Sequence, residues 1–143
     1  MKMLKSIMLG IAMVAVCSMA NAKATKGTDE PLTENYVVST YVAAITQGNL
    51  KDFTRILDND VTFSATQNNE VKSFQKDDVI ANLKANEGIK QECTTTTSKV
   101  KETPDGTVYQ VDMKYADHTR TDMVTIVEGS NGWKITDVSS LYK

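Results

Sequence analysis

Apolar side chains recur at steps of three and four residues over positions 33–47, and this spacing predicts an amphipathic helix of about fifteen residues. Gly48 follows the last periodic position, where glycine commonly ends a helix. Asn49 is suited to cap a second, short helix whose apolar positions 50, 53, 56 and 57 share one face. The cluster Asp58-Asn59-Asp60 is then expected to end this second helix.

The hydrophobic period changes from helical to alternating after position 60. Alternation over 61–65 predicts a strand, and a polar turn over 66–70 leads into a short strand at 71–74. Helical spacing then returns from residue 76 or 77 to about Gly88, which predicts a third helix. Four more strands are expected, in the order 93–102, 107–115, 121–128 and 133–142, with turns at 104–106 and 129–132. The predicted order is therefore α-α-β-β-α-β-β-β-β.

This order favours an α+β domain in which three helices pack on one face of a curved antiparallel sheet of about six strands. Such a sheet would close partly around the helices and leave a conical interior. The chain contains one Trp, five Tyr and three Phe, which are enough aromatic side chains to line that interior.

Residues 1–22 have the order of a secretory leader. Lys2 and Lys5 precede an uncharged apolar run over positions 7–16, and the segment ends in Ala20-Asn21-Ala22, an A-x-A cleavage pattern. The apolar run is too short for a permanent transmembrane helix, and no later segment approaches the roughly eighteen apolar residues required. We therefore expect a mature chain that does not span the membrane.

Cleavage after Ala22 implies a periplasmic or secreted protein with a flexible spacer over 23–31 and a single domain over 32–143. Lipidation at Cys17 is a disfavoured alternative. Lipoprotein processing needs a small residue before the cysteine, and this chain has Val16 there.

Composition changes once the leader is set aside. Removing 22 of the 143 residues leaves 121, and the formal net charge changes from −2 to −4 because the leader holds two lysines and no acidic residue. This balance excludes the basic footprint of a nucleic-acid-binding protein.

With the leader removed, Cys93 is the one cysteine, so no intramolecular disulfide is expected. A single histidine and a single cysteine give no zinc ligand set, and no phosphate-binding loop occurs, so we expect no metal and no cofactor.

Three local sequences, in this order and spacing, resemble the nuclear transport factor 2-like superfamily and, within it, the exported bacterial Putative lumazine-binding family. They are Gly48-Asn49-Leu50-Lys51-Asp52-Phe53, Asp58-Asn59-Asp60-Val61-Thr62-Phe63 and Gly132-Trp133-Lys134-Ile135. The resemblance implies a cone-shaped fold over nearly the whole mature domain. The superfamily includes isomerases, dehydratases, cyclases and binding modules without chemistry, so the fold alone selects no function.

The first functional hypothesis is a non-catalytic module that binds a small apolar or aromatic molecule. On strand 107–115, Tyr109, Val111, Met113 and Tyr115 alternate with polar residues and are the better candidates for the interior. That face offers hydroxyls but no acid or base. The predicted pocket is lined by Tyr36, Tyr41, Phe53, Phe63, Phe74, Tyr109, Met113, Tyr115 and Trp133.

The second hypothesis is an enzyme of the isomerase, dehydratase or cyclase type. His118 is the single histidine, and Asp117 or Asp122 could orient it as a general acid or base, with Arg120 binding an anion. The same stretch falls between two predicted strands, however, and the simpler interpretation is a solvated hairpin connection over 115–122. The sequence therefore favours binding over catalysis.

The third hypothesis is an interaction role in which the sheet pairs with a second copy of the chain. Homodimers through the sheet are common in the superfamily. The Thr-rich strand predicted over 93–102, together with Val124 and Ile126, would supply the outer face of such a homodimer.

Overall fold

The computed structural model describes residues 30–143. The predicted leader, the cleavage site after Ala22, Cys17 and nearly all of the predicted spacer lie outside these residues. The described elements are α2 (Glu34–Gln47), the 3-10 turn η2 (Thr54–Ile56), β1 (Leu57–Gln67), β2 (Glu70–Phe74), α3 (Lys76–Ala85), β3 (Thr94–Thr103), β4 (Gly106–Lys114), β5 (Thr119–Gly129) and β6 (Gly132–Tyr142).

Helix α2 begins and ends with capping interactions, of which the sequence indicated the one at Gly48. The Thr33 side chain accepts a hydrogen bond of 3.1 Å from the backbone N–H of Tyr36, which satisfies one of the free donors of the first turn. Gly48 follows the helix in the left-handed conformation at φ 69° and donates its N–H to the carbonyl of Ala43.

The predicted second helix is wrong. Asp52 adopts a positive φ of 63°, which interrupts helical geometry, and only the three-residue turn η2 follows it. Leu57 already begins strand β1, so the cluster Asp58-Asn59-Asp60 lies inside this strand and does not end a helix. Residues 30–143 thus contain two α-helices, not three.

Six strands form one sheet in the order β2-β1-β6-β5-β4-β3. Four of the five neighbouring pairs are antiparallel, and the fifth, β1 with β6, is parallel. The expectation of an antiparallel sheet is corrected at this pair. A parallel pair needs a long crossover between its strands, and here α3 and the β3–β5 meander supply it.

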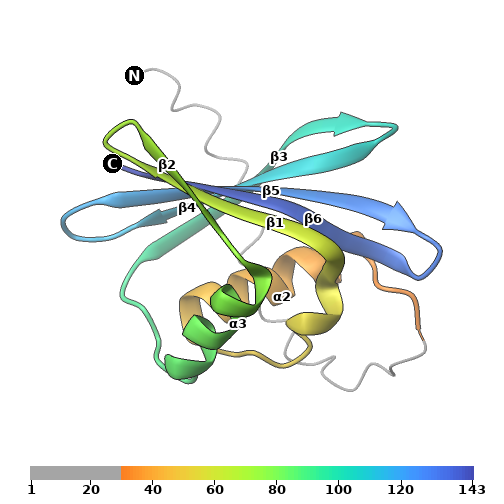
Figure 1. Ribbon diagram of the computed structural model, residues 1–143, viewed down its shortest axis with the longest axis horizontal. Coiled ribbons are helices and arrows are strands. Elements are labelled where there is room, and N and C mark those ends of the chain that lie inside the picture. Colours follow the sequence, from red (N-terminus) through yellow and green to blue (C-terminus); the bar gives the residue numbers. More distant parts are fainter. Residues whose placement is uncertain (1–29) are drawn as a thin grey trace.

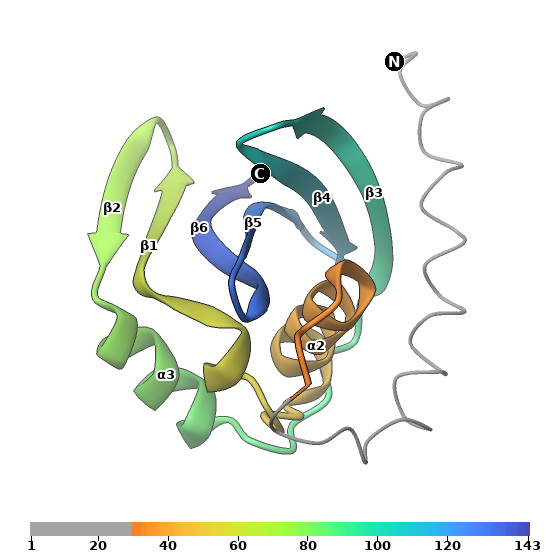
Figure 2. The same ribbon diagram turned by 90° about the vertical axis from the view of Figure 1, so that its right-hand side faces the viewer.

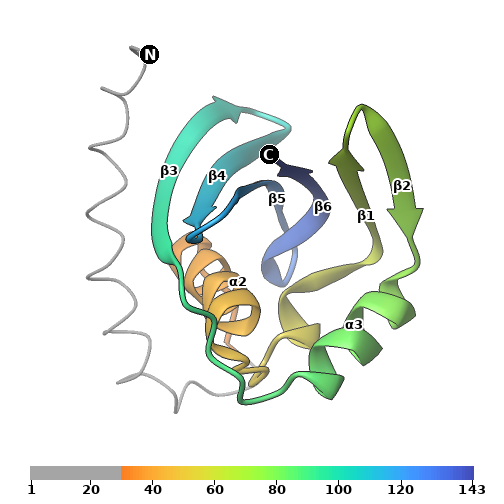
Figure 3. The same cartoon turned by 90° about the vertical axis from the view of Figure 1, so that its left-hand side faces the viewer.

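Both α-helices cover the same face of the sheet (Figure 1). The sheet curves around them, with α2 below the β3–β4 side and α3 below the β1–β2 side (Figures 2 and 3). The predicted α+β cone is therefore present, with its interior facing the two helices.

The core lies between α2 and the inner face of the central strands. Along β4, Tyr109, Val111 and Met113 are buried and alternate with more exposed residues, as the sequence predicted. Val124 and Ile126 on β5 are buried on this same inner face, at 1% and 0% exposure. They are therefore unavailable to the outer face of a homodimer, which corrects that part of the third hypothesis.

The segment formed by β2 and α3 is packed more weakly than the rest of the domain. No residue of either element is buried. The apolar side chains Val79, Ile80 and Leu83 of α3 are partly buried against the core, whereas Phe74 at the end of β2 is 43% exposed. This segment forms an outer wall of the cone.

Candidate functional site

A cavity of about 190 Å³ lies between the β2–α3 segment, helix α2 and the inner face of the sheet. Its walls are mainly apolar, and its polar groups come from both helices, from β1 and from the ends of β5 and β6. The lining residues are Tyr41, Ile45, Phe63, Ser64, Ala65, Phe74, Val79, Asn82, Leu83, Arg120, Val138, Ser140 and Tyr142.

Strand register explains how the sheet supplies this wall. Phe63 on β1 lies opposite Phe74 on β2 and, on its other side, opposite Val138 on β6. Ala65 lies two residues further along β1 and opposite Ser140. Because residues two apart on a strand share a face, these pairs form a continuous inner surface.

The helices close the cavity through residues spaced one turn apart. Tyr41 and Ile45 are four residues apart on α2, and Val79 and Leu83 have the same spacing on α3. Residues with this spacing lie on one face of a helix. Each helix therefore presents one aromatic or aliphatic ridge to the cavity.

Arg120, Asp122 and Tyr41 form a buried polar group at one side of the cavity. The Nε and Nη2 atoms of Arg120 donate hydrogen bonds of 2.9 and 3.0 Å to the two carboxylate oxygens of Asp122. The Tyr41 hydroxyl donates to Oδ2 of the same carboxylate at 2.5 Å. The Asp122 side chain is 0% exposed and that of Arg120 is 19% exposed. Three donors thus stabilise a carboxylate that has no contact with solvent.

Burial and the charge of Asp122 together set the ionisation of Tyr41 and Arg120. Burial is the main reason that the pKa of Tyr41 lies well above its usual value, and the neighbouring Asp122 carboxylate raises it further. Burial alone would lower the pKa of Arg120, but the Asp122 carboxylate outweighs it and the pKa lies above its usual value. At neutral pH Tyr41 is therefore a hydrogen-bond donor and Arg120 is a cation.

Strand β6 holds the outer part of the group in place. Tyr142 lies opposite Arg120 in the β5–β6 register, and Ser140 lies opposite Asp122. The Arg120 guanidinium carbon is 5.5 Å from the centre of the Tyr142 ring, within the range of a cation–π contact. The aromatic ring thus restricts the direction in which the guanidinium points.

Three of the nine residues proposed to line the pocket, Tyr41, Phe63 and Phe74, line this cavity. Phe53, Tyr109 and Met113 lie in the buried core, and Tyr36, Tyr115 and Trp133 pack against its edge. The six belong to the packing of the domain and not to the lining of the cavity.

Tyrosine hydroxyls at the edge of the core have partners within the domain. The hydroxyl of Tyr36 donates to Asp52, and that of Tyr109 donates to Glu34. The hydroxyl of Tyr115 donates to the side-chain oxygen of Gln91. These hydrogen bonds connect α2 to the turn before η2 and to β4, and they connect the loop after α3 to the end of β4.

The residues of the proposed acid–base cluster lie in two different environments. The connection between β4 and β5 covers only residues 115–118, and there Nδ1 of His118 lies 2.7 Å from Oδ1 of Asp117. The side chain of Asp117 is 87% exposed and that of His118 is 40% exposed. The His118 ring stacks on the Tyr115 ring at a centroid distance of 4.5 Å.

Asp122, by contrast, belongs to the interior of β5. The predicted solvated connection over 115–122 is therefore wrong beyond residue 118. The sequence contains a signal for this: Asp122, Val124 and Ile126 alternate in one register, which places the carboxylate on the face of its buried neighbours. Its partner Tyr41 is far away along the chain, and no local pattern links the two residues.

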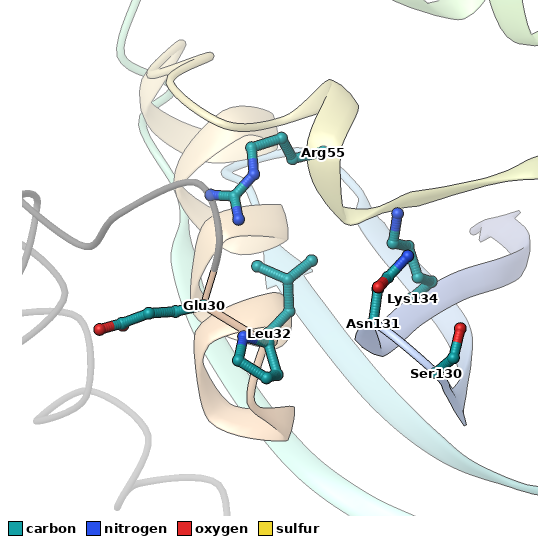
Figure 4. Close-up of a pocket in the computed structure, with 7 residues that line it drawn as sticks. Glu30, Leu32, Arg55, Ser130, Asn131 and Lys134 are labelled. Carbon is teal, nitrogen blue, oxygen red and sulfur yellow. The ribbon is translucent and has the colours of Figure 1, made fainter.

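A larger groove of about 450 Å³ lies at the opposite end of α2 (Figure 4). It is lined by Glu30, Pro31, Leu32, Arg55, Ser130, Asn131 and Lys134. Leu32 anchors this groove through a backbone bridge to Gly132. The groove adjoins the first described residue, and its lining is more polar than that of the inner cavity. We therefore place the candidate site at the inner cavity.

The described residues offer no other obvious centre for chemistry. Within residues 30–143, no three His, Cys, Asp or Glu side chains are grouped so that they could hold a metal ion. In the same range, no helix has both the length and the apolar character needed to cross a membrane.

Several solved structures share this fold. An NTF2-like protein of unknown function from Silicibacter pomeroyi DSS-3 has 22% sequence identity and a TM-score of 0.58, over 75% of this chain and 88% of that chain. NTF2-like proteins of unknown function from Shewanella baltica OS155 and Methylobacillus flagellatus KT both have a TM-score of 0.60. Their identities are 9% and 11%, over 75% of this chain and 88% and 86% of theirs. These likenesses show the fold alone.

A search of curated protein sequences found no match. The sequence model of one family, described as Putative lumazine-binding, matches residues 33–143, which include every helix and strand described above. The chain therefore belongs to the Putative lumazine-binding family, and its fold is NTF2-like.

Proposed function

We propose that the domain binds a small, largely apolar molecule in the cavity between the β2–α3 segment and the sheet, and that it does so without catalysis. The observation that supports this most directly is the composition of the cavity. Aromatic and aliphatic walls surround a few fixed polar groups, which is the usual character of a small-molecule site.

The size of the cavity limits the ligand. A volume of about 190 Å³ equals the liquid volume of about six water molecules and lies below the roughly 300 Å³ of sites for drug-sized ligands. A ligand of one or two rings suits this space. The family description adds lumazine, a heteroaromatic compound, to the compounds worth testing.

The arrangement of Asp122 supports binding over acid–base catalysis. Its carboxylate accepts hydrogen bonds from Arg120 twice and from Tyr41 once, which occupies most of its roughly four acceptor positions. A general base needs a free position within hydrogen-bond reach of its substrate. His118 does not line the cavity and contacts Asp117 instead.

The proposal includes export, since the leader pattern of residues 1–22 motivates a periplasmic or secreted location. Mass spectrometry of the protein purified from its native host tests this. A mature N-terminus at Lys23 is expected, and an intact Met1 would contradict export.

Ligand binding is tested with thermal shift and calorimetry on the purified protein, using lumazine and short alkylbenzenes, together with native mass spectrometry for a co-purified ligand. A ligand at a hundred times its Kd stabilises the folded state by about 2.7 kcal/mol. We expect at least one compound to bind. If no compound binds and none co-purifies, the proposal fails.

Two tryptophan variants on α3 place the binding in the cavity. Val79 lines the cavity, and Val79→Trp should fill it and abolish binding. Ala81 is exposed on the same helix, so Ala81→Trp is the matched control and should bind like the unaltered protein. Equal binding by both variants would place the ligand elsewhere.

A further inference from the structure

The charge of the cavity wall is already balanced. Arg120 is the one lining residue that is charged at neutral pH, and its charge is paired with the carboxylate of Asp122 directly behind it. The two side chains make two parallel hydrogen bonds, so a ligand meets a neutral pair and not an isolated cation. The cavity therefore carries no net charge that would attract an anion.

The same pair still offers hydrogen-bond donors. A guanidinium has five N–H groups in a fixed plane, and Asp122 takes one from Nε and one from Nη2. The pair with Asp122 thus leaves Nη1 and one N–H of Nη2 outside the contact with that carboxylate. Arg120 lines the cavity and its side chain is 19% exposed, so part of this outer edge is accessible.

Ser140 adds a second polar group beside this edge. It lies opposite Asp122 in the strand register and lines the cavity, and the residue is 7% exposed. A hydroxyl can both donate and accept. Arg120 and Ser140 together thus present several donors and one acceptor.

The cost of desolvation decides which ligand suits this arrangement. An anion that enters the cavity loses much of its favourable hydration, and its attraction to Arg120 is opposed by its repulsion from Asp122. A neutral carbonyl loses much less hydration and still accepts hydrogen bonds from the guanidinium edge. An amide N–H next to that carbonyl can donate to Ser140.

We propose that the site selects an uncharged ring compound with a carboxamide- or lactam-type group, whose carbonyl accepts hydrogen bonds from Arg120 while its ring packs on Phe63 and Phe74. This inference rests on the proposed function and adds the chemical class of the ligand. It predicts discrimination between a neutral amide and the corresponding acid of the same shape.

Benzamide and benzoate provide this comparison, because they share a ring and differ in charge at pH 7.5. Their Kd values are measured by NMR titration of the unaltered protein, with toluene as the ring without a polar group. Benzamide should bind at least about tenfold more tightly than either of the other two. Benzoate binding as tightly as benzamide would overturn the inference, and so would toluene binding as tightly as benzamide.

Two variants test whether the Arg120–Asp122 pair is responsible. Asp122→Asn removes the balancing negative charge, so benzoate should gain affinity relative to benzamide by about tenfold or more. The double variant Arg120→Met, Asp122→Asn has no charge and no donor at position 120, and its preference for benzamide over toluene should fall to nearly none. An unchanged benzamide-to-benzoate ratio in folded Asp122→Asn would contradict the inference.

The comparison on the unaltered protein needs no variant to fold, so it decides the inference even if the variants are unstable. Failure of the inference differs from failure of the proposed function. If benzoate or toluene binds in the cavity and benzamide does not, the domain binds small molecules but not the class inferred. If none of these probes and none of the earlier compounds bind, both proposals fail.

Discussion

The Tyr41 hydroxyl on α2 donates a 2.5 Å hydrogen bond to Asp122 on β5, a residue 81 positions further along the chain. Both residues are almost completely buried, at 1% and 0% exposure. The bond therefore joins the helical layer to the sheet through the middle of the core. It also fixes the carboxylate that orients Arg120 at the cavity.

Replacing Tyr41 with Phe should lower the free energy of unfolding by about 1–3 kcal/mol, because Asp122 would lose one of its buried donors without gaining water. Urea denaturation with circular dichroism measures this. Tyr115→Phe is the control, since its hydroxyl bonds to Gln91 in an exposed position, and it should cost less than about 0.5 kcal/mol. Equal losses for the two variants would contradict the structural role of the buried bond.

Alkaline pH should destabilise the protein in a specific window. Burial raises the pKa of Tyr41, Tyr109 and Tyr115 above the ordinary 10.0, to about 12 for Tyr115. Because the folded state holds these protons more tightly than the unfolded state, their contribution is complete below about pH 10 and is lost as the pH rises beyond it. Unfolding free energies measured between pH 8 and pH 11 should fall above about pH 10.

The variant Tyr41→Phe serves as the control for this pH dependence. It lacks the most deeply buried of these phenols, so its stability should fall less steeply above about pH 10 than that of the unaltered protein. Identical slopes would show that the Tyr41 proton does not contribute.

The alternation of apolar and polar residues predicted most of the strands of the sheet. It placed Tyr109, Val111 and Met113 inward on β4, and all three are buried. The same rule applied to β5 would have placed Asp122 inside with Val124 and Ile126, but its neighbours His118 and Asp117 suggested a solvated loop. A polar residue that alternates in register with buried residues should be assigned to the buried face, even where its side chain suggests a solvated loop.

The second helix, the pairing of β1 with β6 and the lining of the cavity were predicted wrongly or only in part, because they depend on features that a local sequence pattern does not show. The apolar positions 50, 53, 56 and 57 fit a helix, yet the left-handed conformation of Asp52 limits the segment to the turn η2. Parallel pairing of β1 with β6 depends on contacts between distant segments. The cavity likewise depends on residues from both helices and four strands, so its lining requires the tertiary structure.

Phe63 and Phe74 form a matched pair for testing the weak packing of the outer wall. They lie opposite each other in the β1–β2 register and both line the cavity, yet Phe63 is 7% exposed and Phe74 is 43% exposed. Phe63→Ala should cost about 3–5 kcal/mol of stability, whereas Phe74→Ala should cost about 1 kcal/mol or less. Denaturant unfolding compares them, and a loss for Phe74→Ala as large as that for Phe63→Ala would contradict a loosely packed wall.

Gly48 and Gly88 provide a second matched pair. Both have positive φ, at 69° and 82°, so alanine costs about 1–2 kcal/mol of backbone strain at either position. At Gly48 an added Cβ would also lie 2.5 Å from the backbone nitrogen of Gly88, whereas at Gly88 it would meet nothing within 4 Å. Gly48→Ala should therefore lower the melting temperature clearly more than Gly88→Ala. Equal shifts would indicate that the backbone at Gly48 moves freely.

The place of β6 in the sheet has a consequence for how the chain folds. This last strand, Gly132–Tyr142, lies between β1 and β5, so the β1–β2 hairpin and the β3–β5 meander meet only through it. Until β6 has paired with both β1 and β5, the two halves have no shared hydrogen-bond ladder. Folding by closure of such distant segments is slow. Pairing of β6 with both of its neighbours should therefore be a late step in folding, because it needs both halves of the sheet to be in place.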